Sequence, residues 1–479
     1  SDTGWSFDIR KLKVADSVLV FQHEDEEQVT VRNINLQMEQ DEHHLASVEL
    51  SGRVNRDQRD LTLSLNANVN ASDYPHQLTA NIQQLNWQLT GANLPTQGIA
   101  GQGTLQAVWR EEQKQLELDN LNLQANDSSL KGQASVTFEE KPKWVLNLQF
   151  DKLNLENLLP PLPASATDSE AAQTGQSQAA VSRPVISSNL DQPDYNVLRG
   201  FTADILLKAT SLRWRGMDFT DVSSQMFNQN GLLVISELSG KMGAGHLSLP
   251  GTLDVRKEAS TAEFQPRLDN VEIGTILKAF NYPIALTGQL SLAGDFSGSD
   301  IDAQAFRHSW QGQAHVEMND TRMEGMNFQQ MIQQAVERSG GDVKSQQNLD
   351  NVTRLDHFVT DMTLDNGEVT LDNMAGESAM LALTGKGTLD LVKLNCDTLF
   401  NIRVLGGWDG ESKLINFLKA TPVPLRVYGQ WQALNYSLQV DQILRKHLQD
   451  EAKRRLNDWA DRNKDSRNGK DVKKLLDKL

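Results

Sequence analysis

The sequence predicts a mainly β protein built from antiparallel strands, and three observations lead to this prediction. Apolar and polar residues alternate along most of the chain, as in residues 61–65, so that one face of each strand is apolar and the other polar. Two Asn-Gly pairs, at 230–231 and 366–367, suit two-residue hairpin turns. Glycines recur within the apolar rows themselves, as at Gly52 and Gly288. Short strands joined by tight turns form an antiparallel meander.

The two Asn-Gly turns predict specific strand pairings. The turn at 366–367 would place Leu364 opposite Val369. The turn at 230–231 would join the strands that contain Met226 and Ile235. Both pairings leave apolar residues on one side of the sheet.

The glycines in the apolar rows bear on whether the sheet closes on itself. A glycine inside a strand usually marks a bulge, a bend or a close approach, so repeated glycines would curl the sheet. Alternation alone favours a closed β-sandwich or barrel core. The length of 479 residues, the 32 Gly and the apolar content of 38% instead suit an open curved sheet. Its exposed apolar side would form a lipid channel.

The residues predicted to line such an apolar groove are the apolar members of the alternating strands. They are Val48, Leu50, Val54, Leu61, Leu63, Leu65, Val69, Leu105, Leu146, Leu148, Ile205, Leu247, Leu249, Leu253, Ile284, Leu286, Leu290, Leu292, Leu381, Leu383, Leu389, Leu391 and Ile402.

Composition divides the chain into four parts. Residues 160–184 are rich in Pro, Ala, Ser, Thr, Gln and Gly and almost free of large apolar residues, which is typical of a flexible linker or loop. The predicted parts are an N-terminal β region (1–159), this linker or loop (160–184), a second β region with short helices (185–440) and a C-terminal helix with a basic tail (441–479).

Few helices are predicted. Apolar residues at helical spacing indicate short helices over 274–280, 328–336 and 414–420. The strongest helical pattern covers residues 441–461. We expect its apolar stripe to cover the chain's own sheet, and a membrane surface is the alternative because basic residues flank the stripe. The stripe consists of Leu444, Leu448, Ala452, Leu456 and Trp459.

The charge of the chain argues against nucleic acid as a partner. The formal net charge is −17, so most of the surface would repel a phosphate backbone. Residues 441–479 differ from the rest, because they hold 12 Lys and Arg against 8 Asp and Glu. An acidic body therefore carries a mildly basic tail.

No motif for catalysis or metal binding is complete. Nucleophile elbows, phosphate loops and HExxH helices are missing from the sequence. Cys396 is the only cysteine, which excludes an intramolecular disulfide and a CxxC motif. Residues 461–465 have the spacing of a calcium loop, but Ser466 replaces its Gly and Val472 replaces its Glu. We expect no enzyme activity, no metal and no cofactor.

The sequence predicts no membrane span, since no run approaches the roughly 18 consecutive apolar residues that one requires. A signal peptide is not evident either. Because Ser1 lies within strand-like alternation, we expect a targeting segment upstream of it.

Several long strings resemble enterobacterial members of the AsmA family, which belongs to the bridge-like lipid transfer superfamily. The resemblance extends over essentially the whole chain, and ordered strings of this length are highly specific. The strings are ADSVLVFQ (15–22), GRVNRDQRD (52–60), NVEIGTILKAFNYP (270–283), TRMEGMNFQQMI (321–332) and GGWDGESK (406–413).

This resemblance implies a fold and a function. The fold would be an elongated curved antiparallel sheet that forms an open hydrophobic groove, folded over like a taco shell. The protein would stand in the periplasm, tethered by an inner-membrane helix upstream of Ser1. It would move phospholipid from the inner toward the outer membrane and affect outer-membrane protein assembly, with assembly factors as possible partners. No catalytic residue comes with the resemblance.

Two other classes of function stay open. A scaffold that only contacts outer-membrane assembly factors would need no empty groove. An enzyme acting on lipid or cell-wall glycan would need a polar cluster on the apolar face, which the alternation does not indicate.

Overall fold

The computed structural model describes residues 11–22, 28–161, 195–340, 343 and 350–478. In these residues 24 strands are hydrogen-bonded into one sheet, which confirms the predicted mainly β fold. The chain divides into two compact units. The first unit comprises residues 1–282 and 293–311, and the second unit comprises residues 283–292 and 312–479. Strand β17 (Leu286–Ser299) contributes residues to both units.

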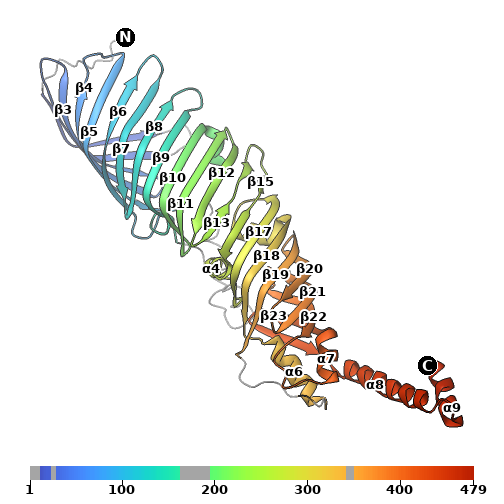
Figure 1. Cartoon of the computed structure of the whole chain (residues 1–479). Coiled ribbons are helices and arrows are strands. Elements are labelled where there is room, and N and C mark those ends of the chain that lie inside the picture. The colour runs from blue at the N-terminus through green and yellow to red at the C-terminus, as the bar shows by residue number, and fades with distance from the viewer. Residues whose placement is uncertain (1–10, 23–27, 162–194, 341–342, 344–349, 479) are drawn as a thin grey trace. The chain divides into compact units, whose positions relative to one another are not determined.

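The first unit consists almost entirely of strands that follow one another in chain order (Figure 1). Its elements are β1 (Lys11–Gln22), β2 (Gln28–Gln40), β3 (Leu45–Arg56), β4 (Arg59–Asn70), β5 (Gln77–Gly91), β6 (Ile99–Arg110), β7 (Gln115–Ala125), β8 (Ser128–Thr137), β9 (Lys143–Asn154), η1 (Leu155–Asn157), η2 (Tyr195–Gly200), β10 (Thr202–Trp214), β11 (Met217–Gln229), β12 (Leu232–Met242), β13 (Gly245–Ser248), β14 (Gly251–Asp254), β15 (Thr261–Phe264), β16 (Arg267–Glu272), α4 (Ile273–Ala279) and α5 (Ala303–Ser309).

One strand pair of the first unit is parallel. Strand β9 pairs with β10 in parallel, with Leu146 beside Ile205 and Leu148 beside Leu207. A parallel pair needs a crossover of a dozen or more residues, and β9 ends 48 residues before β10 begins. The predicted linker at 160–184 falls in this crossover and, from residue 162 onward, lies outside the described residues. The sheet thus continues from one side of it to the other.

Both predicted hairpins are confirmed. Leu364 pairs with Val369, and the turn residues Asn366 and Gly367 have φ values of 49° and 90°. Positive φ at both positions is the signature of a type I′ turn, which matches the twist of the flanking strands. Met226 likewise pairs with Ile235.

The alternation changes phase at a repeated kind of β-bulge. Asn33, Asn120, Asp221 and Asn373 have φ values of 53°, 52°, 49° and 53°, and each lies where the strand register shifts. Asn and Asp tolerate this left-handed conformation better than other non-glycine residues. A bulge adds one residue to a strand and increases its twist. Bulges at Asn and Asp residues therefore bend and twist the strands, a role that was expected for the glycines.

The glycine at 101 has a different role. A Cβ atom at Gly101 would collide with the indole ring of Trp87 on the neighbouring strand. The glycine therefore leaves room for a ring of its own sheet to lie against the backbone.

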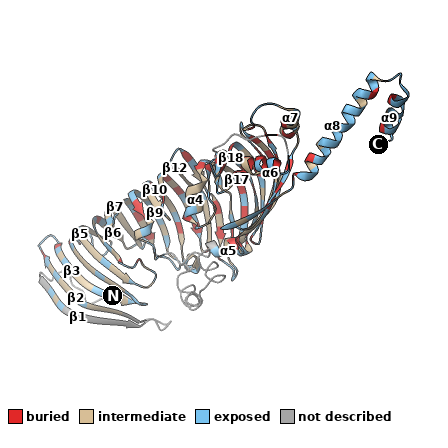
Figure 2. Ribbon diagram, turned by 90° about the horizontal axis from the view of Figure 1, so that it is seen from below, coloured by how far each residue is buried: buried red, intermediate tan, exposed pale blue. Residues whose placement is uncertain are grey.

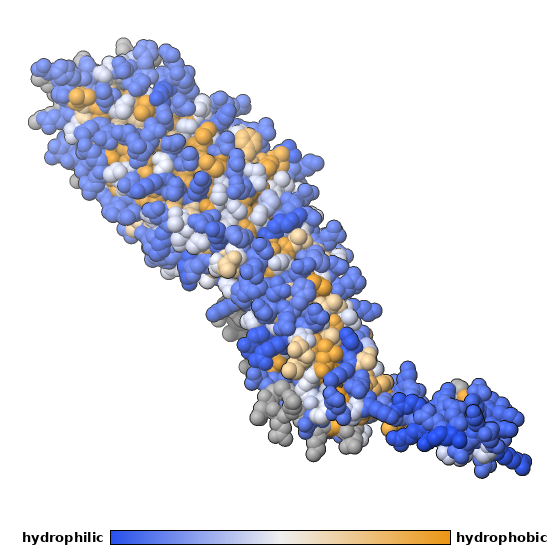
Figure 3. Space-filling view, in the orientation of Figure 1, coloured by the Kyte–Doolittle hydropathy of each residue, from blue (hydrophilic) through white to orange (hydrophobic). Residues whose placement is uncertain are grey.

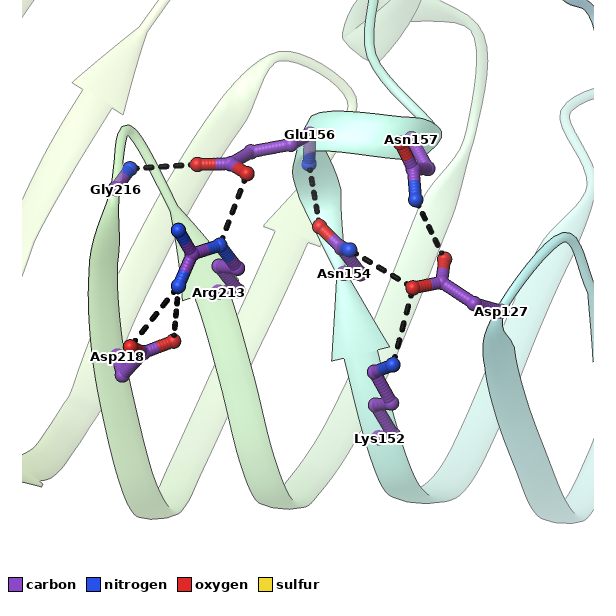
Figure 4. Close-up of polar contacts among 8 residues, drawn as sticks. All are labelled: Asp127, Lys152, Asn154, Glu156, Asn157, Arg213, Gly216 and Asp218. Carbon is purple, nitrogen blue, oxygen red and sulfur yellow. Dashed lines mark hydrogen bonds and ion pairs between the residues drawn. The ribbon is translucent and has the colours of Figure 1, made fainter.

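A short turn of helix after β9 is fastened to the turn between β7 and β8 (Figure 4). The carboxylate of Asp127 accepts hydrogen bonds of 2.9 Å from the side-chain amides of Asn154 and Asn157. The ammonium of Lys152 lies 3.1 Å from the same carboxylate. Burial raises the pKa of Asp127, but the bonds from Asn157, Asn154 and Lys152 outweigh it and hold the pKa at about 2.

The same helical turn is fastened on its other side to the β10–β11 hairpin. One oxygen of Glu156 accepts a hydrogen bond of 2.6 Å from the backbone N–H of Gly216. The other accepts one of 3.0 Å from Nε of Arg213, and Arg213 also binds Asp218 through Nη1 at 2.8 Å. Two hairpin ends are thus joined through η1.

The second unit combines strands with longer helices (Figure 1). Its elements are the first residues of β17, β18 (Gln311–Glu324), α6 (Phe328–Arg338), β19 (Val352–Asp365), β20 (Glu368–Glu377), β21 (Leu381–Asp390), β22 (Asn395–Val404), α7 (Lys413–Ala420), β23 (Val423–Gln430), β24 (Ala433–Leu438), α8 (Asp441–Arg462) and α9 (Arg467–Asp477).

Helices α6 and α7 close a core over the strands of the second unit. Ile332 and Val336 of α6 and Ile402 of β22 are fully buried there, and the rings of Phe328 and Phe400 lie 5.2 Å apart. Figure 2 shows this concentration of buried residues around α6 and the neighbouring strands, whereas the strands β5 to β10 of the first unit are mostly intermediate.

The expected packing of the C-terminal helix on the sheet is wrong for most of its length. Leu444, in the first turn of α8, is buried in the core of the second unit. Leu448, Leu456 and Trp459 are 66%, 46% and 40% exposed. The basic residue Arg455 lies within the same helical stripe, which makes the stripe a poor match for an apolar core. No helix of the described residues is both long and apolar enough to cross a membrane.

The closed core predicts a large difference between two substitutions. Ile402→Ala should destabilise the protein by about 2–5 kcal/mol, because it leaves a cavity in a fully buried site. Leu63→Ala, at a half-buried site of the first unit, should cost less. Urea unfolding followed by circular dichroism measures both, and equal losses would contradict the assigned difference in burial.

The contacts of Asp127 predict a pH effect. Its folded pKa of about 2 lies below its ordinary value, so its stabilising contribution is present above pH 4 and disappears as the pH falls toward 2. Asp127→Asn should therefore lose less stability than the unmodified protein between pH 4 and pH 2. Asp151→Asn is the matched control, since this carboxylate on β9 is exposed and the partners of Asp127 are Asn154, Asn157 and Lys152. Urea unfolding at each pH measures the free energy of unfolding. Equal losses of stability in the two variants between pH 4 and pH 2 would contradict the role assigned to Asp127.

Candidate functional site

A row of aligned apolar residues and glycine crosses eleven strands of the first unit. Neighbouring members are register partners on adjacent strands, so their side chains lie on one face of the sheet. The row is Val14, Leu36, Leu50, Leu65, Leu85, Gly103, Leu123, Leu130, Phe150, Ala209 and Val222, on β1 through β11. We call the face that carries this row the apolar face.

The bulges keep the row on one face. Ile82 and Leu85 are three residues apart in β5, so strict alternation would place them on opposite faces. A register shift between them brings both to the apolar face, opposite Leu105 and Gly103. Without this shift, either Ile82 or Leu85 would lie on the polar face.

Most of the apolar face is half-buried. Eleven of the predicted groove residues in the first unit have intermediate exposure, whereas Leu105 and Leu253 are buried and Leu249 is 39% exposed. Figure 3 shows hydrophobic atoms between hydrophilic ones over these strands. The intermediate residues are Val48, Leu50, Val54, Leu61, Leu63, Leu65, Val69, Leu146, Leu148, Ile205 and Leu247.

Three apolar clusters of this face adjoin one another. Leu105, Leu146 and Leu148 share one cluster. Strand β9 continues from Leu148 into a second cluster that contains Phe150, and Phe219 belongs both to that cluster and to a third beside α4. The three clusters therefore follow one another from β5 to α4 through Leu148, Phe150 and Phe219.

The predicted lining residues of the second unit are in a different environment. Leu381, Leu383 and Ile402 are buried in the core beneath α6 and α7, so they do not line an open surface. Leu290 and Leu391 are also buried. The remaining residues of the prediction, Ile284, Leu286, Leu292 and Leu389, are half-buried.

Sequence reasoning missed several members of the apolar face. Leu85, Leu121, Leu123 and Phe219 were not predicted, because their strands change phase at a bulge. A signal was available in the sequence, since Asn120 stands between two apolar residues spaced by three.

The opposite face is polar and bonded to itself. Asn66 donates a hydrogen bond of 3.2 Å to Gln84, and Asn120 donates one of 2.9 Å to Gln106. These side chains are exposed and join adjacent strands. This polar face can therefore remain exposed to solvent, as one face of an antiparallel sheet commonly does.

Metal binding and thiol chemistry find little support among the described residues. No cluster of three metal-binding side chains is present among them. Cys396 is half-buried, and burial raises the pKa of its thiol, which disfavours the reactive thiolate. A cavity of about 410 Å³ between β11 and β16 is lined by Lys241, His246 and Arg267, but also by Asp221, which pairs with Lys241 at 3.3 Å.

Comparison with known proteins gives a family. Residues 79–374 match the model of the AsmA family. The chain is 70% identical over 478 residues to Protein AsmA of Escherichia coli (strain K12), covering all of this chain and 78% of that relative. No solved structure matches the chain. The AsmA family is not a known enzyme family. From the family match and this identity, the chain belongs to the AsmA family.

Proposed function

We propose that this protein carries phospholipid along the apolar face of its first unit, through the periplasm from the inner toward the outer membrane. The observation that carries the proposal is the apolar row, whose members are paired from strand to strand over eleven strands. An ordinary soluble protein covers such a face with a second layer of its own. Half-buried leucines along the row instead suit an apolar ligand.

The energetics support a lipid as that ligand. Each CH₂ group removed from water is worth about 0.8 kcal/mol, so an acyl chain gains with every position of the row that it covers. The row offers similar apolar contacts from strand to strand. A chain moving along it would stay shielded at each step, while its headgroup remained in water.

Membership of the AsmA family supports the setting. We propose that an anchor in the inner membrane holds the protein in the periplasm and that the transported phospholipid affects outer-membrane assembly. Contacts with outer-membrane assembly factors would be secondary to this transport. The hydrogen-bonded polar face is suited to an aqueous compartment.

A charge placed on the apolar face tests the proposal. Leu148→Asp should reduce the phospholipid that co-purifies with the protein by more than about half, because a carboxylate beside an acyl chain must be desolvated. Asn147→Asp is the matched control, since it puts the same charge on the exposed side of the same strand. Solvent extraction followed by mass spectrometry measures the bound lipid.

The outcomes separate carrier from scaffold. Unmodified protein and the Asn147→Asp variant should carry phospholipid in similar amounts. If the unmodified protein carries none, a scaffold without lipid cargo is the better account. If Leu148→Asp carries as much as the control, lipid binds somewhere other than this face.

A further inference from the structure

A positive charge lies against two aromatic rings at one end of the apolar face. Arg215 belongs to the turn between β10 and β11. Its guanidinium carbon is 5.3 Å from the ring centre of Trp214 and 4.8 Å from that of Phe280, which follows α4. The two rings are 5.9 Å apart and nearly perpendicular. Cation–π attraction therefore holds the guanidinium in place.

This guanidinium has an unmet hydrogen-bond donor. The Nε atom of Arg215 is shielded from solvent and has no hydrogen-bond partner among the described residues. Burial lowers the pKa of Arg215 from its ordinary value, although the group keeps its proton. A shielded donor without an acceptor costs free energy, so the site favours an added acceptor.

The nearby acids are already engaged. Glu156 accepts hydrogen bonds from Arg213 and from the backbone of Gly216, and Asp218 accepts two from Arg213. Arg213, two residues before Arg215, thus forms ion pairs with two carboxylates. The contrast shows that this hairpin can pair an arginine with acids, whereas the described part of the chain supplies no carboxylate partner for Arg215.

The surroundings of Arg215 are apolar. Trp214 and Phe280 pack against the buried side chains of Met217 and Val271. Phe219 connects this cluster to the apolar face over β9 and β10. An acyl chain on that face would bring its headgroup to the edge where Arg215 lies.

We propose that Arg215 binds the phosphate of a phospholipid whose acyl chains lie on the apolar face. This inference rests on the proposed function and adds the residue that selects the headgroup. A guanidinium presents parallel N–H donors that match two phosphate oxygens. The aromatic rings exclude water, which strengthens such charge-assisted bonds.

The test compares two lipids that differ in the phosphate headgroup. The full chain, freed of lipid, is incubated with an equimolar mixture of dioleoylphosphatidylglycerol and dioleoylglycerol in detergent micelles, and bound lipid is quantified by mass spectrometry. The unmodified protein should be enriched in the phospholipid. Arg215→Met keeps the apolar stem but removes the donors, so the enrichment should fall about tenfold. Arg215→Lys keeps the charge but not the parallel N–H donors of the guanidinium. Its enrichment in the phospholipid should lie between that of the unmodified protein and that of Arg215→Met.

Arg213→Met is the matched control. It removes an arginine that already has acidic partners, so it should lower the melting temperature and leave the lipid ratio unchanged. An unchanged ratio in Arg215→Met, or equal binding of both lipids by the unmodified protein, would overturn the assignment of Arg215 alone. Absence of both lipids from the unmodified protein would overturn the proposed function as well.

A second arm separates the lipid headgroup from free phosphate. Inorganic phosphate is added without lipid, and its ³¹P resonance is followed in the unmodified protein and in Arg215→Met. We expect equal line widths in both, because binding depends on the acyl chains. Broadening that only the unmodified protein causes would identify an ion site and refute the lipid assignment.

Discussion

The structure depends on keeping apolar side chains on one face of strands that bend. Successive side chains of a strand point to opposite faces, so apolar residues spaced by three would point to different faces in a regular strand. Asn120 and Asp221 lie between such residues, and each is the extra residue of a bulge with a positive φ. The bulge brings the apolar residues on either side of it to the same face. The eleven-strand row includes pairs without a shift, such as β3 with β4, and depends on these corrections at the pairs where the register shifts.

The two units use the same alternation to different ends. In the second unit α6 and α7 cover the apolar side, and Ile402 and Leu425 are fully buried. In the first unit α4 and η1 contribute residues to two of the clusters, whereas residues such as Leu65 and Leu148 stay half-buried. A covered face stabilises its own unit. An uncovered one is available to a ligand, which is the basis of the proposed transport.

The sequence predicted the strands and hairpins well, because alternation and Asn-Gly turns are local signals. Leu364 opposite Val369 follows directly from the turn at 366–367. Burial was harder to predict, since Leu63 and Leu383 look alike in sequence, yet only Leu383 lies beneath helices from distant segments. Arg215 was missed because its environment depends on Phe280, which is 65 residues away. Isolated polar residues acquire such neighbours only through the fold.

The central claim is that the bulges hold a continuous lipid-binding row in phase, and site-specific photo-crosslinking tests it most directly. A photoreactive residue is placed in turn at positions 82, 83, 84 and 85 of β5, and crosslinked phospholipid is detected by mass spectrometry. Lipid should crosslink at 82 and 85, because a register shift places both Ile82 and Leu85 on the apolar face. It should not crosslink at 83 or 84. Crosslinks at 82 and 84, or at none of the four positions, would contradict the account.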